Sequence, residues 1–192
     1  MKVFINPGHS PNGIPDCGAV NRELGLRECD VAYDISGLIK KYLETAYCEV
    51  IMLQSDNLNN DGVGENVCQL ANSEKCDVFV SVHCNAHNGS ARGAETLVMK
   101  QNSKAGILAD CIQSQLVPSL KKIDKAFADR GVKERPNLVV LNSTTMPAAL
   151  VEVGFIDNYA DACLMTMYNH VIAAAIARGI TDYAIKKCHL EK

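Results

Sequence analysis

The sequence contains no tryptophan, and aromatic residues make up only 5% of its 192 residues. A protein that binds sugars or single-stranded nucleic acid by stacking would have few side chains to use. Charges of the two signs nearly balance, since 19 Lys and Arg are offset by 22 Asp and Glu to give a net charge of −3. Without a positive excess, we expect no binding to the phosphates of nucleic acid.

Disulfide and membrane signals are also missing. The nine cysteines are odd in number and include no Cys-x-x-Cys pair, so they form no closed disulfide framework and indicate a reducing compartment. No apolar run approaches the roughly 20 residues of a membrane helix, and we expect no membrane insertion. No signal peptide precedes Asn6-Pro7-Gly8. Either a leader was removed or the protein leaves its cell by another route.

What the sequence does contain is an alternation of strand-like and helix-like segments. With 192 residues and 47% apolar content, it is the size of one domain spanning 1–192. The pattern predicts an α/β fold, a three-layer αβα sandwich around a largely parallel or mixed sheet of about six strands. Segment 9–25, rich in Gly and Pro, is predicted as a functional loop, and polar segment 121–136 as a connection. The predicted strands are 2–6, 49–53, 77–82, 93–99, 137–141 and 148–153; the predicted helices are 28–46, 64–75, one capped by Ser103 and ending near Pro118, one capped by Asn158, and 168–187.

Polar side chains gather where these strands end. His9 follows the first strand, His83 follows 77–82 directly, and Glu152 interrupts the apolar run Ala148–Gly154. Glu28 opens the first long helix. Because sites in open α/β sheets form beyond the carboxyl ends of strands, we expect these groups to meet there. Two imidazoles with a nearby carboxylate are typical of a catalytic zinc site, in which a fourth position stays open for water.

Other residues compete for these roles. Strand alternation puts His87 on the face of His83, although Asn88-Gly89 favours a turn there. Cys17 lies in the same loop as His9 and could bind zinc as a thiolate. A serine or cysteine nucleophile is not indicated, because Gly-x-Ser-x-Gly is absent and no cysteine is visibly activated.

The sequence resembles the catalytic domain of the type-3 zinc-dependent N-acetylmuramoyl-L-alanine amidases. Blocks in family order and spacing span nearly the whole chain, and together they are highly specific. They are Ile5–His9, Asp16–Ala19, Gly25–Glu28, Ala71–Asn72, Asp77–Ala86, Gly93–Glu95, Val140–Asn142 and Pro147–Asn158.

The resemblance implies one zinc ion per chain, with His9, Glu28 and His83 as ligands and Glu152 as the catalytic glutamate. It implies hydrolysis of the amide between the lactyl group of muramic acid and the first L-alanine of the stem peptide in peptidoglycan. One departure is Asn6 in place of the usual Asp, which removes a charge that we expect to support His9. Ser10, Cys17 and Cys84 also depart from the family pattern. No interval is long enough for the extra helix that blocks the zinc in some division amidases.

Two alternatives stay open. Another zinc peptidase, such as a carboxypeptidase, would need an arginine for a terminal carboxylate, for which Arg92 and Arg130 are candidates. A wall-binding pseudoenzyme would have no use for the buried base Glu152. An amidase would act at the bacterial cell wall, either as an autolysin or as an endolysin made in the cytoplasm. The free thiols and the missing signal peptide favour an endolysin.

Overall fold

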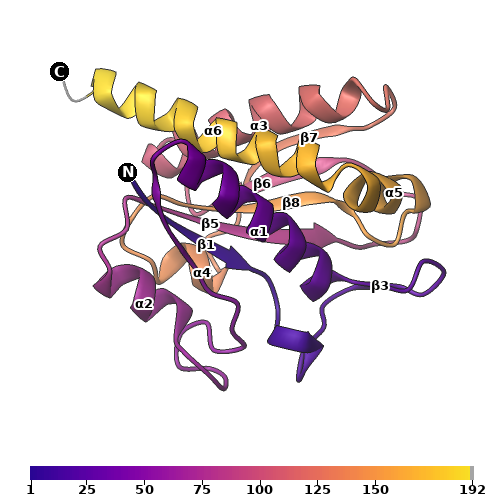
Figure 1. The fold of residues 1–192 in the computed structure, drawn as a ribbon, viewed down its shortest axis with the longest axis horizontal. Helices are drawn as coiled ribbons and strands as arrows, with labels where there is room; N and C mark the ends of the chain where they lie inside the picture. Colours follow the sequence, from indigo (N-terminus) through magenta and orange to yellow (C-terminus); the bar gives the residue numbers. More distant parts are fainter. Residues whose placement is uncertain (191–192) are drawn as a thin grey trace.

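The computed structural model describes residues 1–190 and contains a six-stranded sheet with helices on both faces (Figure 1). The strand order is β4-β1-β5-β8-β6-β7, and every neighbouring pair is parallel except β8 and β6. The strands are β1 (Lys2–Pro7), β4 (Glu49–Met52), β5 (Val78–Asn85), β6 (Ala94–Val98), β7 (Asp129–Glu134) and β8 (Ala148–Phe155), and a separate ribbon pairs β2 (Val20–Asn21) with β3 (Leu26–Arg27). The helices are η1 (Pro11–Gly13), α1 (Glu28–Thr45), α2 (Val67–Ser73), α3 (Lys104–Lys121), α4 (Val139–Asn142), α5 (Tyr159–Met167) and α6 (Asn169–Leu190).

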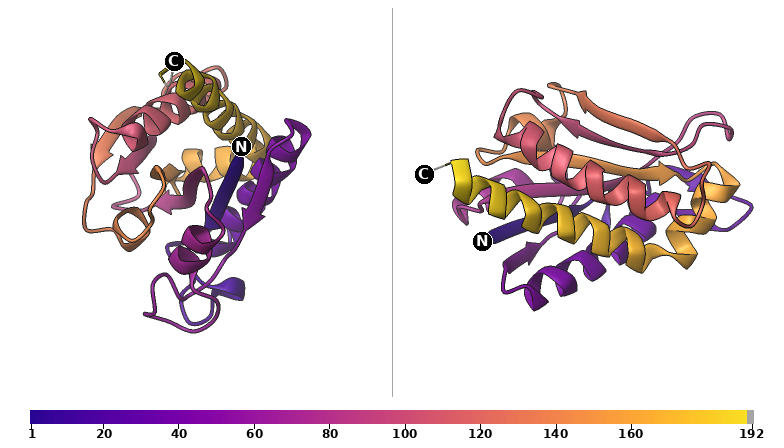
Figure 2. Two further views of the ribbon diagram at one scale, coloured as in Figure 1. Left: turned by 90° about the vertical axis from the view of Figure 1, so that its left-hand side faces the viewer. Right: turned by 90° about the horizontal axis from the view of Figure 1, so that it is seen from above.

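The helices form two layers. Helices α1, α6 and α3 lie side by side on one face of the sheet, with α6 in the middle (Figures 1 and 2). The short helices α2 and α4 lie on the opposite face. This arrangement confirms the predicted three-layer αβα sandwich with a mixed, largely parallel sheet.

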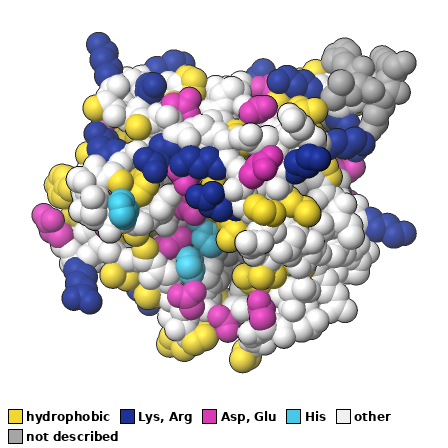
Figure 3. Space-filling view, turned by 180° about the vertical axis from the view of Figure 1, so that it is seen from behind, with side chains coloured by type: hydrophobic (Ala, Val, Ile, Leu, Met, Phe, Trp, Pro, Cys, Tyr) yellow, Lys and Arg dark blue, Asp and Glu magenta, His cyan; other side chains and the backbone are white. Residues whose placement is uncertain are grey.

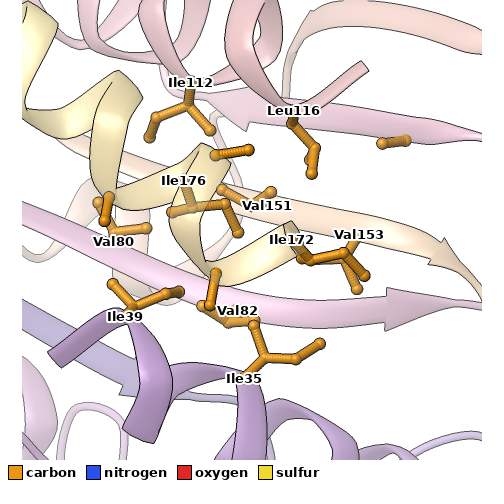
Figure 4. Packing of buried hydrophobic residues seen from close by; sticks show 14 of the residues in the cluster. Ile35, Ile39, Val80, Val82, Ile112, Leu116, Val151, Val153, Ile172 and Ile176 are labelled. Atoms are coloured by element: carbon orange, nitrogen blue, oxygen red, sulfur yellow. The ribbon is translucent and has the colours of Figure 1, made fainter. Parts of the chain in front are cut away.

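Side chains of the central strand alternate between two apolar clusters. Val80 and Val82 of β5 point toward α1, α3 and α6, where they pack among residues such as Ile35 and Ile176 (Figure 4). Phe79 belongs to the other cluster, beside α2 and α4. Because alternate residues of a strand share a face, Ser81 and His83 follow Phe79 toward the α2 and α4 side. The pleat therefore determines on which face His83 lies.

Two sequence predictions are wrong between residues 121 and 141. Segment 121–136 is not only a connection, because Asp129–Glu134 forms the edge strand β7. Four of its six residues are charged and none is fully buried, so no alternating apolar pattern marks it. Segment 137–141 is not a strand, because Val139–Asn142 forms one helical turn, α4. Val140 and Leu141 are buried there against the sheet, and this packing outweighs the strand propensity of valine.

Smaller departures concern the ends and burial of elements. Helix α3 ends at Lys121, near Pro118 as predicted, and its last turn buries Leu120 completely. Strand β4 lies at the edge of the sheet, and its residues are partly exposed. Strand β5 extends to Asn85, which brings His83 into the strand itself. The predicted caps at Ser103 and Asn158 are confirmed, since each side chain accepts a backbone hydrogen bond from the first turn of its helix.

Within residues 1–190, no single helix is both long and apolar enough to cross a membrane. The bent pair formed by α5 and α6 reaches that threshold by length and composition when the two are taken together. All nine cysteines are free in the structure.

Candidate metal centre

The carboxyl ends of β1 and β5 bring two histidines together. Gly8 N donates to Val82 O at 2.9 Å, which extends the pairing of the two strands by one residue. His9 follows with a left-handed φ of 64°, a conformation that a non-glycine residue rarely adopts outside tight turns and functional sites. Its ring lies edge-on to that of His83, with the ring centres 5.0 Å apart.

Glu28 completes the group from the first position of α1. Its Oε1 lies 3.0 Å from His9 Nε2 and 3.0 Å from His83 Nδ1. One potential ligand atom from each of the three residues lies within 4.8 Å of the others. Two backbone groups fix the carboxylate, since Cys84 N donates to Oε1 and Ala19 N donates to Oε2, both at 2.9 Å. Three protein ligands meeting at one point could hold a metal ion with a further position open.

The electrostatics of this group favour an ionised carboxylate. Burial alone would raise the pKa of Glu28, but its hydrogen bonds and charge interactions with His83 and His9 outweigh burial and hold that pKa well below its usual range. Burial lowers the pKa of His9, yet Glu28 and Asp16 together raise it to about 9. In the metal-free protein His9 is therefore protonated near neutral pH, and a metal ion must displace that proton.

Asp16 orients His9, a role that the sequence analysis did not assign. Its Oδ2 lies 2.7 Å from His9 Nδ1, and its Oδ1 accepts a hydrogen bond from Gly18 N at 2.8 Å. This contact directs Nε2 of His9 toward Glu28 and fixes the tautomer that a metal requires. The signal in the sequence was a carboxylate within the same loop as His9.

The expectation that a charge at residue 6 would support His9 does not hold in the structure. Its side chain is buried, accepts a hydrogen bond from Ser81 Oγ at 2.8 Å and donates to Leu53 O at 3.0 Å. None of its hydrogen bonds involves His9, which Asp16 supports instead. The replacement of Asp by Asn at this position thus affects the packing between strands rather than the orientation of a ligand.

Two glycines leave room for the three potential ligands. A Cβ added at Gly8 would lie 2.3 Å from Cε1 of His83, and one at Gly18 would lie 2.6 Å from Nε2 of His9. Gly18 also has a φ of +68°, which side chains rarely adopt. The loop approaches both rings so closely that only glycine fits at these positions.

Glu152 lies next to the group on β8. It is the register partner of His83 in β5 and of Glu95 in β6, so the three side chains form a row across one face of the sheet. The Oε2 atom of Glu152 is buried and has no hydrogen-bond partner in the described part of the chain. Burial raises its pKa to about 7, and the charges of Glu28 and Glu95 add to this while His83 and His9 oppose it. A carboxylate with such a pKa can both accept and return a proton near neutrality.

A cavity of about 280 Å³ opens beside the two histidines. Helix α4 and strand β8 give it an apolar wall, and Asp16 and Asp56 are its only carboxylates among the residues that line it. Figure 3 shows this side of the molecule, where two histidine side chains lie next to each other among acidic and basic groups. The group is therefore accessible to a substrate.

Comparison with known proteins agrees with this geometry. A sequence model of the family described as N-acetylmuramoyl-L-alanine amidase matches residues 3–182. The chain belongs to this amidase family. It is 34% identical to an uncharacterised cell wall amidase of Bacillus anthracis, over 97% of this chain and 36% of that protein. It is 33% identical to the N-acetylmuramoyl-L-alanine amidase LytC of Bacillus subtilis strain 168, over 94% of this chain and 35% of that protein.

Solved structures show the same amidase fold. The crystal structure of an N-acetylmuramoyl-L-alanine amidase from Clostridium difficile 630 superposes with a TM-score of 0.79 at 28% identity, covering 97% of both chains. The chain thus corresponds to about a third of the length of the two Bacillus relatives and to nearly all of the clostridial domain.

Other candidates within the amidase chain lie outside the group. The cluster of potential ligands in residues 1–190 contains His9, Glu28 and His83 but neither Cys17 nor His87. His87 is exposed, and its backbone N–H donates to Asp157. Arg92, a candidate for binding a terminal carboxylate, is engaged by Asp124 and by the fully buried Asp161.

Proposed function

We propose that this chain hydrolyses the amide bond between N-acetylmuramoyl groups and L-alanine of the stem peptide in bacterial peptidoglycan. Residues 1–192 would act as one catalytic domain at the cell wall. The observation that carries the proposal is the convergence of His9, Glu28 and His83 beside Glu152, whose Oε2 is buried without a partner. A buried, unpartnered carboxylate oxygen costs stability, so its retention favours a catalytic role.

The three ligands fit one zinc ion per chain. Two imidazole nitrogens and one carboxylate oxygen are a donor set typical of catalytic zinc, and the glycines at 8 and 18 keep the space between them clear. When bound there, zinc would act as a Lewis acid toward the scissile carbonyl and would make the attacking water more acidic.

Glu152 would move the proton. Its Oε2 would accept the proton of the water molecule as the water oxygen attacks the carbonyl carbon. The same carboxyl group would then deliver that proton to the nitrogen of L-alanine, because an amine leaves poorly unless it is protonated. Asp16 would keep His9 in the required orientation throughout, and Glu28 would remain ionised.

The test is digestion of purified peptidoglycan followed by identification of the new end groups. We expect new amino termini on L-alanine, and none with the Glu152→Gln protein or after removal of metal by a chelator. Release of free terminal amino acids would instead indicate a carboxypeptidase. Binding to the wall without any release would indicate a pseudoenzyme.

A further inference from the structure

Two basic side chains of β7 share one buried carboxylate at the edge of the site. Arg130 Nε lies 2.7 Å and Lys133 Nζ lies 2.6 Å from Oε2 of Glu95. Glu95 is only 6% exposed, whereas Arg130 and Lys133 are exposed by about a third, at 34% and 33% of their side chains. The buried carboxylate of Glu95 therefore holds both cationic groups in place while each stays accessible to solvent.

These cations lie at the end of the row that contains the proposed catalytic residues. His83, Glu152 and Glu95 are register partners across β5, β8 and β6, and β7 follows β6 in the sheet. Lys133 is the register partner of Leu97, which lies two residues after Glu95 and on the same face. The basic pair and Glu152 thus open onto the same side of the molecule, where Figure 3 shows basic side chains near the two adjacent histidines.

The pair has an excess of positive charge on this face. Two cations share one carboxylate, which leaves about one positive charge uncompensated. The acidic residues of β7 do not supply the difference, because Asp129 and Glu134 are register partners of Ala94 and Val98, whose side chains face α3. Asp129 accordingly accepts a hydrogen bond from Gln113 of α3.

Arg130 is also held in a defined orientation. Its guanidinium group lies over the ring of Phe155, with its central carbon 4.8 Å from the ring centre. Its Nε donates to Glu95, while neither terminal nitrogen makes a hydrogen bond to any described residue. A guanidinium group with two free donors on one edge matches the two oxygens of a carboxylate.

The opposite side of the site disfavours an anion. The cavity beside His9 and His83 is lined by apolar residues of α4 together with Asp16 and Asp56. A substrate carboxylate placed there would lie near two like charges. An anionic part of a substrate that spans the site is therefore directed toward β7.

We propose that Arg130 and Lys133 bind a free carboxylate on the second or third residue of the stem peptide, counted from the scissile amide. This inference rests on the proposed amidase function. The distance from β8 to β7 is two strand spacings, or about 10 Å. An extended peptide covers about 3.3–3.6 Å per residue, so roughly three residues span that distance.

The test compares synthetic muramoyl tripeptides in pairs that differ only in one group. In the first pair, one peptide carries a carboxylate on its second residue and the other peptide carries a carboxamide there. In the second pair, the same two groups are compared on the third residue. We expect the zinc-loaded wild-type protein to cleave the acid of at least one pair with a kcat/KM at least tenfold above that of the amide. The Arg130→Gln/Lys133→Gln protein should reduce that ratio to less than threefold.

Two further variants control for folding and for net charge. Loss of both cations leaves the buried carboxylate of Glu95 without a counter-charge and with a hydrogen bond from Asn85 Nδ2 at 3.3 Å. A protein that also carries Glu95→Gln removes this buried charge and should show the same loss of preference. Arg178→Gln removes a positive charge from α6, on the far face of the sheet, and should keep the wild-type ratio. The proposal would be overturned if the wild-type kcat/KM for the acid were less than threefold above that for the amide in both pairs. It would also be overturned if folded variants without the two cations kept the wild-type preference for the acid.

Failure of the proposed amidase function can be distinguished from failure of the carboxylate subsite. If the wild-type protein cleaves no muramoyl peptide, the amidase proposal fails, and calorimetric titration of the same peptides then tests the subsite alone. The acid of one pair should bind at least tenfold more tightly than its amide, and the Arg130→Gln/Lys133→Gln protein should lose this difference. Equal binding of acid and amide by the wild-type protein would refute the subsite.

Discussion

Glu152 of β8 and His83 of β5 are register partners in adjacent parallel strands. Their side chains leave the same face of the sheet, and the backbone ladder rather than a loop fixes their relative positions. A change of the carboxyl group at residue 152 should therefore leave His83, a proposed metal ligand, in place. Catalysis and metal binding can be separated experimentally at this position.

The first prediction concerns catalysis by Glu152. Glu152→Gln keeps the size of the side chain but cannot accept the proton of water, so wall hydrolysis should fall by about 10²–10⁴-fold. Zinc content should stay near that of the wild type. Dye release from labelled wall, metal analysis and thermal unfolding on the same protein measure this. Activity within a few-fold of wild type would refute the mechanism, and a parallel loss of zinc would make Glu152 a ligand instead.

The second prediction concerns stability of the metal-free protein as a function of pH. Because the pKa of Glu152 is raised from 4.5 to about 7, the folded state holds this proton more tightly than the unfolded state does. The contribution to stability is complete below pH 4.5 and is lost as the pH rises to 7. Glu152→Gln removes this loss, so its free energy of unfolding should exceed that of wild type by about 1–3 kcal/mol at pH 8.

Denaturant unfolding at two pH values measures this difference. At pH 4 the wild type and Glu152→Gln proteins should agree to within about 1 kcal/mol, because both side chains are then neutral. Titrating groups far from residue 152 contribute equally to both proteins and cancel in the comparison. A difference of the same size at pH 4 and pH 8 would mean that packing, not ionisation, distinguishes the two side chains.

The third prediction concerns the carboxylate ligand. Glu28→Ala removes the oxygen that lies 3.0 Å from both histidines, so we expect zinc content to fall sharply and activity with it. Metal analysis after dialysis against a limiting zinc concentration measures this. Near-stoichiometric zinc in that protein would mean that Glu28 is not a ligand of the metal.

The fold could be predicted where apolar periodicity was strong. Segment 28–46 showed a clear buried face and is helix α1 over Glu28–Thr45. Strand β7 was not predicted, because an edge strand rich in charged residues carries no apolar pattern. Helix α4 was mistaken for a strand because four apolar residues do not distinguish one helical turn from a short strand.

The site could be predicted in part for a related reason. His9, His83 and Glu152 stand out because polar residues at the ends of apolar strands are costly unless they are used. Asp16 carries no such signal, since an acidic residue in a polar loop is ordinary. Its role depends on the path of the loop that returns it to His9, which only the tertiary structure specifies. The importance of Arg130 likewise follows from its place in an unpredicted strand.

The last prediction concerns the support of His9 by Asp16. The hydrogen bond between them lowers the pKa of Asp16 and helps to raise that of His9, so an ionised Asp16 makes the imidazole a stronger ligand. Asp16→Asn keeps a hydrogen-bond acceptor but removes the charge, and the dissociation constant for zinc should rise by about 10–100-fold. At saturating zinc, activity should stay within a few-fold of wild type, because Glu152 is untouched.

Competition with a fluorescent chelator measures the affinity, and Asp56→Asn is the matched control. Asp56 lines the same cavity, but its hydrogen bond comes from Ser10 Oγ and not from a ligand. If the two substitutions weaken zinc binding equally, the effect comes from the summed negative charge of the cavity rather than from the orientation of His9. If Asp16→Asn binds zinc as the wild type does, then the loop alone positions His9, and the 2.7 Å contact is incidental to metal binding.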